Sequence, residues 1–447
     1  MRLSGKDALP IAGKLFSSPK GKKLNESESH TLTHGFIANP HTGARIDEVL
    51  VTVMKAPKTY TKEDIVEINC HGGILPVRKV LELVLKNGAR LAEPGEFTKR
   101  AFLNGRIDLS QAEAVIDLIR AKTEESGRVA LEQLSGGLSE KITGLRDRLL
   151  SVCAHIEAYI DFPEEEIEPA SMESILNEVR DIEKSLLALS KSFEEGRFFR
   201  EGLKVAIVGR PNVGKSSLLN ALLKRDRAIV TEIAGTTRDI LEEYLNINGL
   251  PTRIMDTAGI RETHEMAEKE GVIRSLRAID DADLVIGIID GTCSLKNEDM
   301  AVLEKIRGKE AIIAINKSDL PTQGNLESTL RPYSEYILKI SAKTEAGLDM
   351  LKEKILDVSL KKNQKSEARG FFDESAGVIV TNIRHKVAID NAVNALNNAA
   401  SALTASLPLE VVAVEMRDAL DRLGEIVGSV TTEDILNRIF SEFCIGK

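Results

Sequence analysis

The sequence predicts a multidomain chain, part α/β and part all-α, in which an inserted α/β domain interrupts a helical domain that follows a smaller α+β domain. The first 105 residues mix strand-like and helical periodicity, and two later stretches, 106–201 and 361–447, carry leucines and isoleucines at three- and four-residue steps. Between them, residues 202–360 contain short apolar runs that end in glycine-rich or polar loops, as in a parallel sheet. At 447 residues the chain is long enough for about three domains.

Composition excludes several classes of protein. The chain is 42% hydrophobic, but no run approaches the roughly 20 apolar residues of a membrane span, so no membrane association is expected. Its four cysteines (Cys70, Cys153, Cys293 and Cys444) lack Cys-x-x-Cys spacing, which argues against a disulfide frame or structural zinc and suits a reducing cytoplasm. No secretory signal opens the chain, and a cytoplasmic location is expected. The net charge of −9 disfavours a broad nonspecific nucleic-acid surface, so any RNA contact should be local or shared with a partner.

Residues 1–105 form the expected α+β domain. Residues 48–54 and 64–69 are strand-like, and residues 76–87 have the period of a helix. The polar tract at 19–30 is expected to be a solvated loop.

Residues 106–201 and 361–447 form the expected helical domain, with 361–370 as a linker. Thr431 and Asp434 are spaced as a capping pair for the last helix. The expected helices cover residues 111–123, 128–134, 139–161, 175–193, 388–403, 409–423 and 432–443.

Residues 209–216 read Gly-Arg-Pro-Asn-Val-Gly-Lys-Ser, between an apolar run at Leu203–Val208 and leucines of helical spacing at 217–224. This is the strand–loop–helix context of a phosphate-binding loop. Backbone N–H groups of such a loop and the positive end of the helix dipole surround a polyphosphate. Lys215 can reach the β- and γ-phosphates, and the Ser216 hydroxyl can ligate Mg²⁺.

Two further loops indicate the base. The apolar run 311–315 ends in Asn316-Lys317-Ser318-Asp319. An ionised Asp319 can accept both the N1–H and the N2–H₂ donors of guanine, a pair that adenine lacks. Ser341-Ala342-Lys343 follows another expected strand and is typical of the loop that closes over guanine in GTPases.

Two segments between these loops have the pattern of GTPase switches. Asp256-Thr257-Ala258-Gly259 should bring an aspartate toward Mg²⁺ and a glycine N–H toward the γ-phosphate, and Gly235-Thr236-Thr237 supplies a threonine ligand. Together the five pieces predict a GTPase that holds Mg²⁺ through Ser216 and Thr237. The residues expected to contact GTP or GDP are Asn212, Val213, Gly214, Lys215, Ser216, Ser217, Thr231, Glu232, Ile233, Ala234, Gly235, Thr236, Thr237, Asp256, Thr257, Ala258, Gly259, Asn316, Lys317, Asp319, Ser341, Ala342 and Lys343.

Two segments outside these loops are distinctive: Pro-Gly-Glu-Phe-Thr-Lys-Arg-Ala-Phe-Leu-Asn-Gly at 94–105 and the ending Phe-Cys-Ile-Gly-Lys at 443–447. With Ile-Asp-Phe-Pro at 160–163 and Gly-Thr-Thr-Arg-Asp at 235–239, they make nearly the whole chain resemble the MnmE (TrmE) family of tRNA-modification GTPases. The resemblance implies an N-terminal folate-binding and dimerisation domain, a helical domain and an inserted Ras-like P-loop GTPase domain.

Members of that family act with a flavin-dependent partner on the wobble uridine of certain tRNAs. They place a carboxymethylaminomethyl or aminomethyl group on carbon 5, with a tetrahydrofolate derivative (5-formyl- or methylene-tetrahydrofolate) implicated as the one-carbon donor. For this chain the resemblance implies a K⁺-activated GTP hydrolase that forms a homodimer and, with the flavin-dependent partner, a heterotetramer.

The group that promotes hydrolysis is not evident from the motifs. Ile260 follows the Asp-Thr-Ala-Gly segment and cannot orient water as the glutamine of Ras-type enzymes does. By residue type Glu268 is one solvated carboxylate among several, whereas the resemblance gives it the role of positioning water. The resemblance also implies K⁺ in place of an arginine finger; Arg238 or Arg261 acting across a dimer is the alternative. The implied K⁺ ligands are Asn212, Thr231, Ile233 and Thr236.

A folate site is implied by the same resemblance. Pterin carries the donor pair of guanine, so a carboxylate should bind it. The implied folate-binding residues are Arg2, Glu67, Arg106 and Lys447, which by residue type alone would be ordinary surface charges. A lone cysteine such as Cys444 is usually a small buried residue. The family's ending, however, implies that Cys444 is a catalytic thiol that acts as a nucleophile or a proton donor.

The chain departs from the family's pattern at its amino-terminal end, and a second function also fits its GTPase motifs. The family usually has a Gly/Pro-rich strand ahead of the Arg-x-Ser-Gly found here at Arg2–Gly5. Either the start of the chain is truncated or wrongly assigned, or the strand is truly missing, in which case an incomplete folate site or dimer is expected. The competing function is a ribosome-assembly GTPase of the Era/Der type. Such proteins carry an RNA-binding KH domain or tandem GTPase domains, and neither is evident in this sequence.

Overall fold

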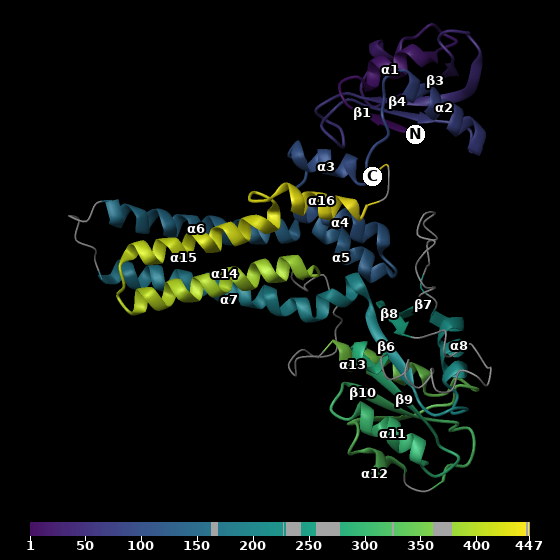
Figure 1. The fold of residues 1–447 in the computed structure, drawn as a ribbon, viewed down its shortest axis with the longest axis vertical. Helices are drawn as coiled ribbons and strands as arrows, with labels where there is room; N and C mark the ends of the chain where they lie inside the picture. Colours follow the sequence, from purple (N-terminus) through teal and green to yellow (C-terminus); the bar gives the residue numbers. More distant parts are fainter. Residues whose placement is uncertain are drawn as a thin grey trace. The chain divides into compact units, whose positions relative to one another are not determined.

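The computed structural model describes residues 1–161, 169–226, 228, 243–255, 278–323, 326–360, 378–443 and 446. The chain divides into two compact units (Figure 1): Met1–Ile116 with Leu134–Thr143 and Asp421–Lys447, and Asp117–Gln133 with Gly144–Leu420. The predicted combination of α/β and all-α parts is confirmed. Among the described residues, no helix has the length and apolar character that crossing a membrane requires.

The first unit contains a five-stranded antiparallel sheet of strand order β1-β5-β4-β3-β2. One face of the sheet buries Val49, Val51 and Val53 against two helices, while Leu32 and Leu50 on the other face stay 58% and 41% exposed. This is the alternation expected of an antiparallel sheet covered on one side. Its elements are β1 (Arg2–Ser4), α1 (Ala8–Leu15), β2 (Phe16–Ser17), the 3₁₀ turn η1 (Leu24–Glu26), β3 (Thr31–Ala38), β4 (Arg45–Met54), β5 (Ile65–Asn69) and α2 (Ile74–Lys86).

The helices α3 (Glu96–Leu103), α4 (Leu109–Arg120) and α16 (Glu433–Ser441) also contribute to the first unit. Leu109 and Ile116 of α4 form a hydrophobic cluster with Phe440 and Phe443. Gly95, just before α3, has a φ of 66°. A Cβ there would lie 2.9 Å from the Phe440 carbonyl oxygen, so the position requires glycine.

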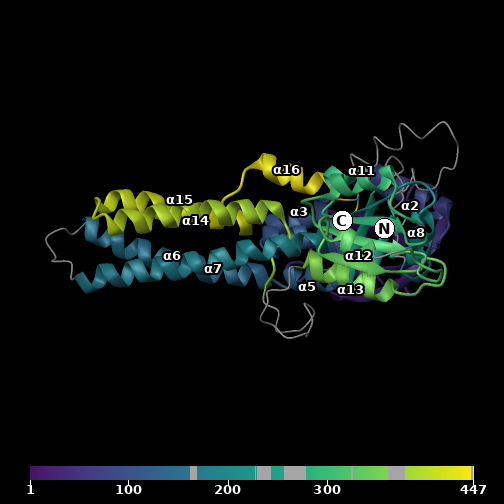
Figure 2. The same ribbon diagram turned by 90° about the horizontal axis from the view of Figure 1, so that it is seen from below.

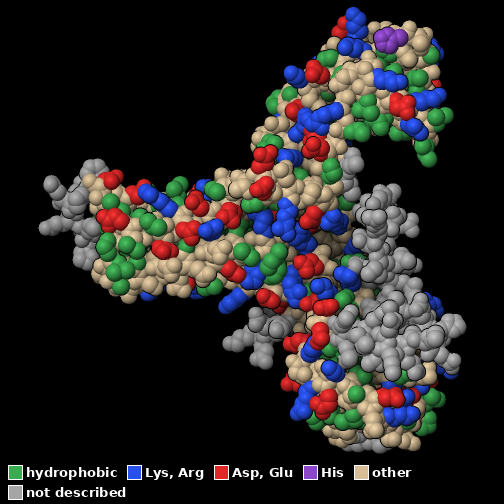
Figure 3. Space-filling view, in the orientation of Figure 1, with side chains coloured by type: hydrophobic (Ala, Val, Ile, Leu, Met, Phe, Trp, Pro, Cys, Tyr) green, Lys and Arg blue, Asp and Glu red, His purple; other side chains and the backbone are tan. Residues whose placement is uncertain are grey.

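Long helices form one part of the second unit. They are α5 (Glu124–Leu134), α6 (Gly137–Asp161), α7 (Pro169–Glu201), α14 (Ile383–Thr404) and α15 (Leu409–Val427), of which α6 and α15 begin or end in the first unit. Helix α7 packs along α14, and Figure 1 shows the two running side by side. Figure 2 shows α6, α7, α14 and α15 lying along a common direction. On the face drawn in Figure 3, Lys and Arg side chains are interspersed with Asp and Glu side chains, in keeping with the net charge of −9.

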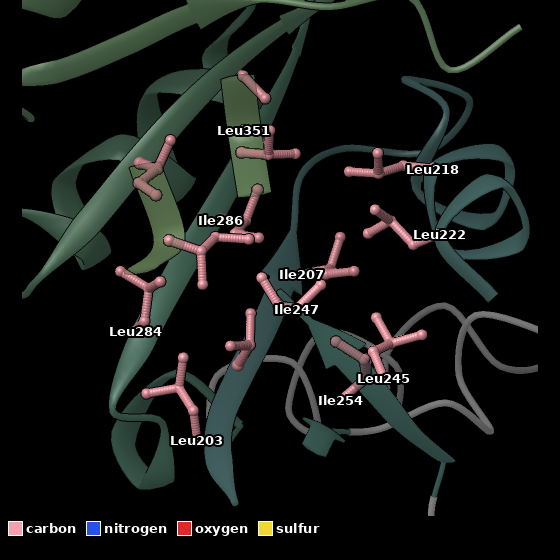
Figure 4. Close-up of a cluster of buried hydrophobic side chains, with 14 of the residues drawn as sticks. Leu203, Ile207, Leu218, Leu222, Leu245, Ile247, Ile254, Leu284, Ile286 and Leu351 are labelled. Atoms are coloured by element: carbon pink, nitrogen blue, oxygen red, sulfur yellow. The ribbon is translucent and has the colours of Figure 1, made fainter. Parts of the chain in front are cut away.

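The other part of the second unit is a six-stranded sheet of order β11-β10-β9-β6-β8-β7, parallel except for the edge strand β7. Successive residues of each central strand pack on opposite faces, as Ile207 and Val208 do, so both faces are buried. Figure 4 shows Leu218 and Leu222 of one covering helix near Ile207. The elements are β6 (Leu203–Val208), α8 (Lys215–Asp226), β7 (Glu243–Ile247), β8 (Leu250–Met255), β9 (Leu284–Asp290), α11 (Asn297–Ile306), β10 (Ala311–Asn316), α12 (Leu326–Leu330), β11 (Tyr336–Lys339) and α13 (Leu348–Ser359).

The last turn of α7 joins this sheet to the helices. Phe198 and Phe199 belong to the same buried cluster as Leu203 of β6. Arg197 donates through Nη2 to Asp283 Oδ1 (2.7 Å), and the backbone N–H of Lys204 donates to Asp283 Oδ2 (3.0 Å). The final residues of α7 are therefore core residues of the sheet.

Three sequence expectations need correction. The helix expected over 175–193 runs over Pro169–Glu201, because proline favours the first position of a helix and the adjacent Phe198 and Phe199 do not continue the apolar period. The tract 19–30 is not wholly solvated, since Leu24 is buried in η1. The capping prediction for α16 was wrong by one residue: the side chain of Thr432, not Thr431, accepts from Ile435 N (3.5 Å). Asp434 lies in the first turn, where a negative charge favours the helix dipole.

Candidate functional site

The predicted phosphate loop lies between the end of β6 and the start of α8. A Cβ at Gly209 would lie 2.5 Å from the Ile288 carbonyl oxygen, and one at Gly214 would lie 2.2 Å from Asn316 Nδ2. Asn212 has a φ of 63°, a conformation that asparagine tolerates better than most residues. The glycines are thus needed for the loop to fold tightly in front of α8, where backbone N–H groups favour an anion.

Lys215 extends from the first turn of α8 back over this loop. Its Nζ donates to the carbonyl oxygens of Gly209 (2.8 Å) and Arg210 (2.9 Å). Burial, and next the charge of Arg210, lower the pKa of the Lys215 ammonium. An anionic ligand near Nζ would offset both effects, which fits the residue to a phosphate group.

Asn316 connects three of the predicted segments. Its Oδ1 accepts from the backbone N–H of Ala342 (2.9 Å), and its Nδ2 donates to the carbonyl oxygen of Val213 (2.8 Å). The residue is 2% exposed, so leaving either bond unmade would cost about 1–3 kcal/mol. The predicted guanine loop, the closing loop and the phosphate loop therefore meet at one buried amide.

Asp319, the predicted base-binding carboxylate, is held by the predicted closing loop. Its Oδ1 accepts from Ser341 Oγ (2.7 Å), and this hydrogen bond lowers the pKa of Asp319. The backbone N–H of Ser318 donates to the Ile340 carbonyl oxygen (3.0 Å), which ties the two loops together again. Asp319 is consequently ionised at neutral pH and has acceptor capacity left for a donor pair.

One polar cluster between these loops was missed in the sequence. Asp290, at the end of β9, accepts through Oδ2 from Lys317 Nζ (2.6 Å) and through Oδ1 from Thr292 Oγ1 (2.7 Å). Burial would raise the pKa of Asp290, but hydrogen bonds from Lys317 and Thr292 outweigh it and lower the pKa to about 2. The signal was available, because a polar residue at the carboxyl end of a central parallel strand faces the ligand edge of the sheet.

Several predicted residues lie outside the described residues: 231–237, 256–259, Glu268, Cys444 and Lys447. Ser216, at the start of α8, is described and exposed. Its hydroxyl suits Mg²⁺, which prefers oxygen ligands. Among described residues there is no group of three or more His, Cys, Asp or Glu side chains arranged to hold a metal.

The residues predicted to bind folate occupy the first unit. Arg2 Nε donates to Glu67 Oε1 (2.7 Å) across the β1–β5 pair, and the Arg2 guanidinium lies 5.8 Å from the centre of the Phe97 ring. Arg106 instead stacks on Tyr60 (4.7 Å to the ring centre) and donates to its carbonyl oxygen (3.3 Å). The structure therefore brings Arg2 and Glu67 together and gives Arg106 a different partner.

Comparisons with known proteins cover the whole chain. A family model described as the MnmE helical domain matches residues 109–444, and one described as the GTP-binding protein TrmE N-terminus matches residues 1–106. Three similar proteins are each named tRNA modification GTPase MnmE. The relative from Alkaliphilus metalliredigens is 46% identical over 448 residues, that from Acetivibrio thermocellus 48% over 450, and that from Clostridioides difficile 46% over 449; each match covers 100% of this chain and 95% of the relative.

Solved structures match a smaller part of the chain. A variant of Era from Aquifex aeolicus bound to GDP·AlF₄⁻ is 30% identical, with 43% of this chain and 65% of that chain covered and a TM-score of 0.27. The G domain of the T. maritima FeoB iron transporter is 25% identical, with 35% and 98% covered and a TM-score of 0.26.

Proposed function

The chain belongs to the MnmE family of tRNA modification GTPases, and from that premise we propose that it hydrolyses GTP to GDP and acts in the modification of tRNA. The observation that carries the GTPase part is the buried Asn316 amide, which holds the phosphate loop and both guanine loops together through Val213 and Ala342. The tRNA part is supported by relatives of that name that match the entire chain. The Era/Der alternative is not favoured, because both family models belong to MnmE.

The chain's own residues supply binding and orientation. Asp319 accepts the two donors of guanine, Lys215 offsets phosphate charge, and N–H groups of residues 209–216 surround the phosphates. Ser216 and Thr237 would hold Mg²⁺, which would supply positive charge to offset that of the phosphate oxygens. Asp256, Thr257, Ala258 and Gly259 complete the nucleotide site in this proposal, as do the switch residues 231–237.

Hydrolysis is proposed to depend on K⁺ and on Glu268. Asn212, Thr231, Ile233 and Thr236 would hold K⁺ through oxygen atoms, and the ion would supply the positive charge that an arginine finger supplies elsewhere. Glu268 would position the attacking water.

The modification reaction is proposed to use a tetrahydrofolate one-carbon unit and a flavin-dependent partner, with the chain acting as a homodimer. Glu67 and Arg2 supply the carboxylate and the cation that a pterin and its glutamate tail would need, with Arg106 and Lys447 as further contacts and Cys444 as the reactive thiol. The Arg2–Glu67 pair on the open face of the first sheet supports this assignment.

The test of the GTPase assignment is a change of base specificity. An amide at position 319 both donates and accepts, so Asp319→Asn should weaken GTP binding at least about tenfold and favour xanthosine triphosphate, whose O2 replaces the guanine amino group. Asp349→Asn, on an exposed carboxylate of the same sheet domain, is the matched control. GTP turnover by Asp319→Asn at the wild-type KM, with no gain for xanthosine triphosphate, would remove Asp319 from the site.

The K⁺ proposal has a separate test. GTP turnover is compared in KCl and NaCl at equal ionic strength over a range of protein concentrations. We expect selective stimulation by K⁺ that rises with protein concentration, and loss of it in Asn212→Ala with nucleotide binding retained. Equal rates in both salts would refute the role of K⁺ while leaving GTP hydrolysis itself intact.

A further inference from the structure

Asp290 lies at the centre of the ligand edge of the six-stranded sheet. Its strand β9 lies between β6, which leads into the phosphate loop, and β10, which leads into the guanine loop. Asp290 is the register partner of Asn316, and its side chain is 8% exposed. A buried carboxylate here can reach groups from both loops.

The phosphate loop contributes Arg210. Its guanidinium is 10% exposed, donates through Nε to Asp299 Oδ2 (3.1 Å) and through Nη2 to Cys293 Sγ (3.0 Å), and lies 3.8 Å from Asp290 Oδ2. Asp299 is fixed in turn, because its Oδ2 also accepts from the backbone N–H of Lys296 (3.0 Å). The Arg210 side chain is thus held on the β9–α11 side of the phosphate loop.

The guanine loop contributes Lys317. Its backbone has a φ of 65°, which costs energy in a residue with a side chain. Its ammonium is 2.6 Å from the same Oδ2 that faces Arg210. One carboxylate oxygen therefore attracts a cation from each loop, and without its charge the two cations would repel each other in a partly buried site.

We propose that Asp290 is a positioning residue that couples the two loops: through Lys317 and Arg210 it sets their separation so that one nucleotide engages its base and its phosphates together. The inference rests on the proposed nucleotide site and adds a residue that contacts no part of the nucleotide itself. A bound nucleotide gains affinity when both loops are already in place, because less freedom is lost on binding.

The test compares Asp290→Asn with the wild type in nucleotide titrations and steady-state hydrolysis. We expect the Kd for GDP and the KM for GTP to rise about tenfold or more, with kcat within about twofold, because the loops' positions change and the hydrolytic groups do not. The matched control is Asp280→Asn, which also removes the charge from an Asp–Lys pair (Asp280–Lys309, 2.8 Å) on the surface of the same unit. It should leave Kd, KM and kcat within twofold of the wild type.

A double-mutant cycle shows whether the effect passes through Lys317. Asp290→Asn combined with Lys317→Met should bind GDP no more than about twofold more weakly than Lys317→Met alone. If the fold-increases in Kd of the two single variants multiply in the double variant, the coupling is overturned, and a wild-type Kd in Asp290→Asn would overturn it too.

If Asp290→Asn does not fold, Thr292→Val removes the 2.7 Å hydrogen bond to Oδ1 and keeps the charge. It should raise Kd two- to threefold, and an unchanged Kd would count against the proposal. Failure of the wild type to bind GDP would instead refute the proposed function.

Discussion

The two sheets of this chain differ in where their candidate functional residues lie: on an open face of one sheet and in loops at the edge of the other. Among the described residues, α1 and α2 pack on one face of the antiparallel sheet of the first unit, and Arg2 and Glu67 lie on the other face. The mainly parallel sheet of the second unit is buried on both faces, so the groups at its candidate site come from the loops at its edge.

This difference has a physical origin. Parallel strands need helical crossovers that cover both faces, and only the ends of the strands remain accessible. Consecutive antiparallel strands need only short turns, so one face can stay open to a ligand or partner. Substitutions at the edge of the parallel sheet should therefore change nucleotide binding. Substitutions on the open face of the antiparallel sheet should change the free energy of unfolding only a little.

The largest effect on nucleotide binding is expected at the edge of the parallel sheet, from Gly214→Ala. The added methyl would lie 2.2 Å from Asn316 Nδ2 at a residue whose φ is 105°. Overpacking and backbone strain together cost about 3 kcal/mol or more, which corresponds to at least about a 100-fold loss of GDP affinity. A fluorescent GDP titration measures it. Gly308→Ala, at a glycine with a φ of 79° and open space around it, controls for strain alone; equal losses in the two variants would contradict the role of the close contact.

The next prediction compares the loss of stability at a buried face of the parallel sheet with that at the open face of the antiparallel sheet. Ile313 in β10 is fully buried, and Ile313→Ala should lower the free energy of unfolding of the second unit by about 4 kcal/mol. Leu50→Ala on the open face of β4 should lower that of the first unit by less than about 1 kcal/mol. Urea unfolding followed by hydrogen exchange of each sheet measures both. A loss at Leu50 as large as that at Ile313 would mean that the open face is covered in solution.

A third prediction concerns Glu96, a buried carboxylate of the first unit that serves the fold. It accepts from Arg90 Nη1 (2.8 Å), Arg100 Nη2 (2.6 Å) and Glu93 N (2.9 Å). The hydrogen bond from Arg90 outweighs burial and, with those from Glu93 and Arg100, lowers the pKa of Glu96 to about 2. Because the folded pKa lies below the unfolded value, this stabilisation is present above about pH 4.5 and is lost as pH falls toward 2.

Glu96→Gln should therefore cost the first unit about 2–3 kcal/mol at pH 7 and much less at pH 3, with GDP affinity unchanged. Urea unfolding at both pH values gives the measurement. Glu26→Gln, on an exposed carboxylate 4.0 Å from Lys23, is the control and should change little. An equal loss at pH 3 and pH 7 would show that packing, not charge, accounts for the effect.

The smallest change in stability is expected at the open-face pair. The side chains of Arg2 and Glu67 are 41% and 31% exposed, so Arg2→Met should alter the free energy of unfolding by less than about 1 kcal/mol. Calorimetric titration with 5-formyl-tetrahydrofolate should nevertheless show weaker binding than in the wild type. Wild-type affinity for the folate would remove Arg2 from the proposed site.

The sequence predicted the strands β6 and β10 because each is a nearly unbroken apolar run ending in glycine or asparagine, and such runs are typical of strands buried on both faces. It also identified the phosphate loop and the two guanine loops by their motifs, and in the structure the three meet at Asn316. It did not predict the Glu96 network, because ion pairs between distant residues leave no periodic pattern. Asp290 had a signal in its position at the end of an apolar strand, but its partners Lys317 and Arg210 did not. Thr431 and Thr432 have the same chemistry, so only backbone geometry decides which one caps α16.

The length of α7 has a mechanical consequence. This helix of 33 residues packs beside α14 along its course and ends with Phe198 and Phe199 in the core of the parallel sheet. At 1.5 Å per residue it is about 50 Å long. A tilt of about 5° at its sheet end, next to the start of β6, would carry its far end through about 4 Å, so a small rotation there becomes a larger displacement along the helix.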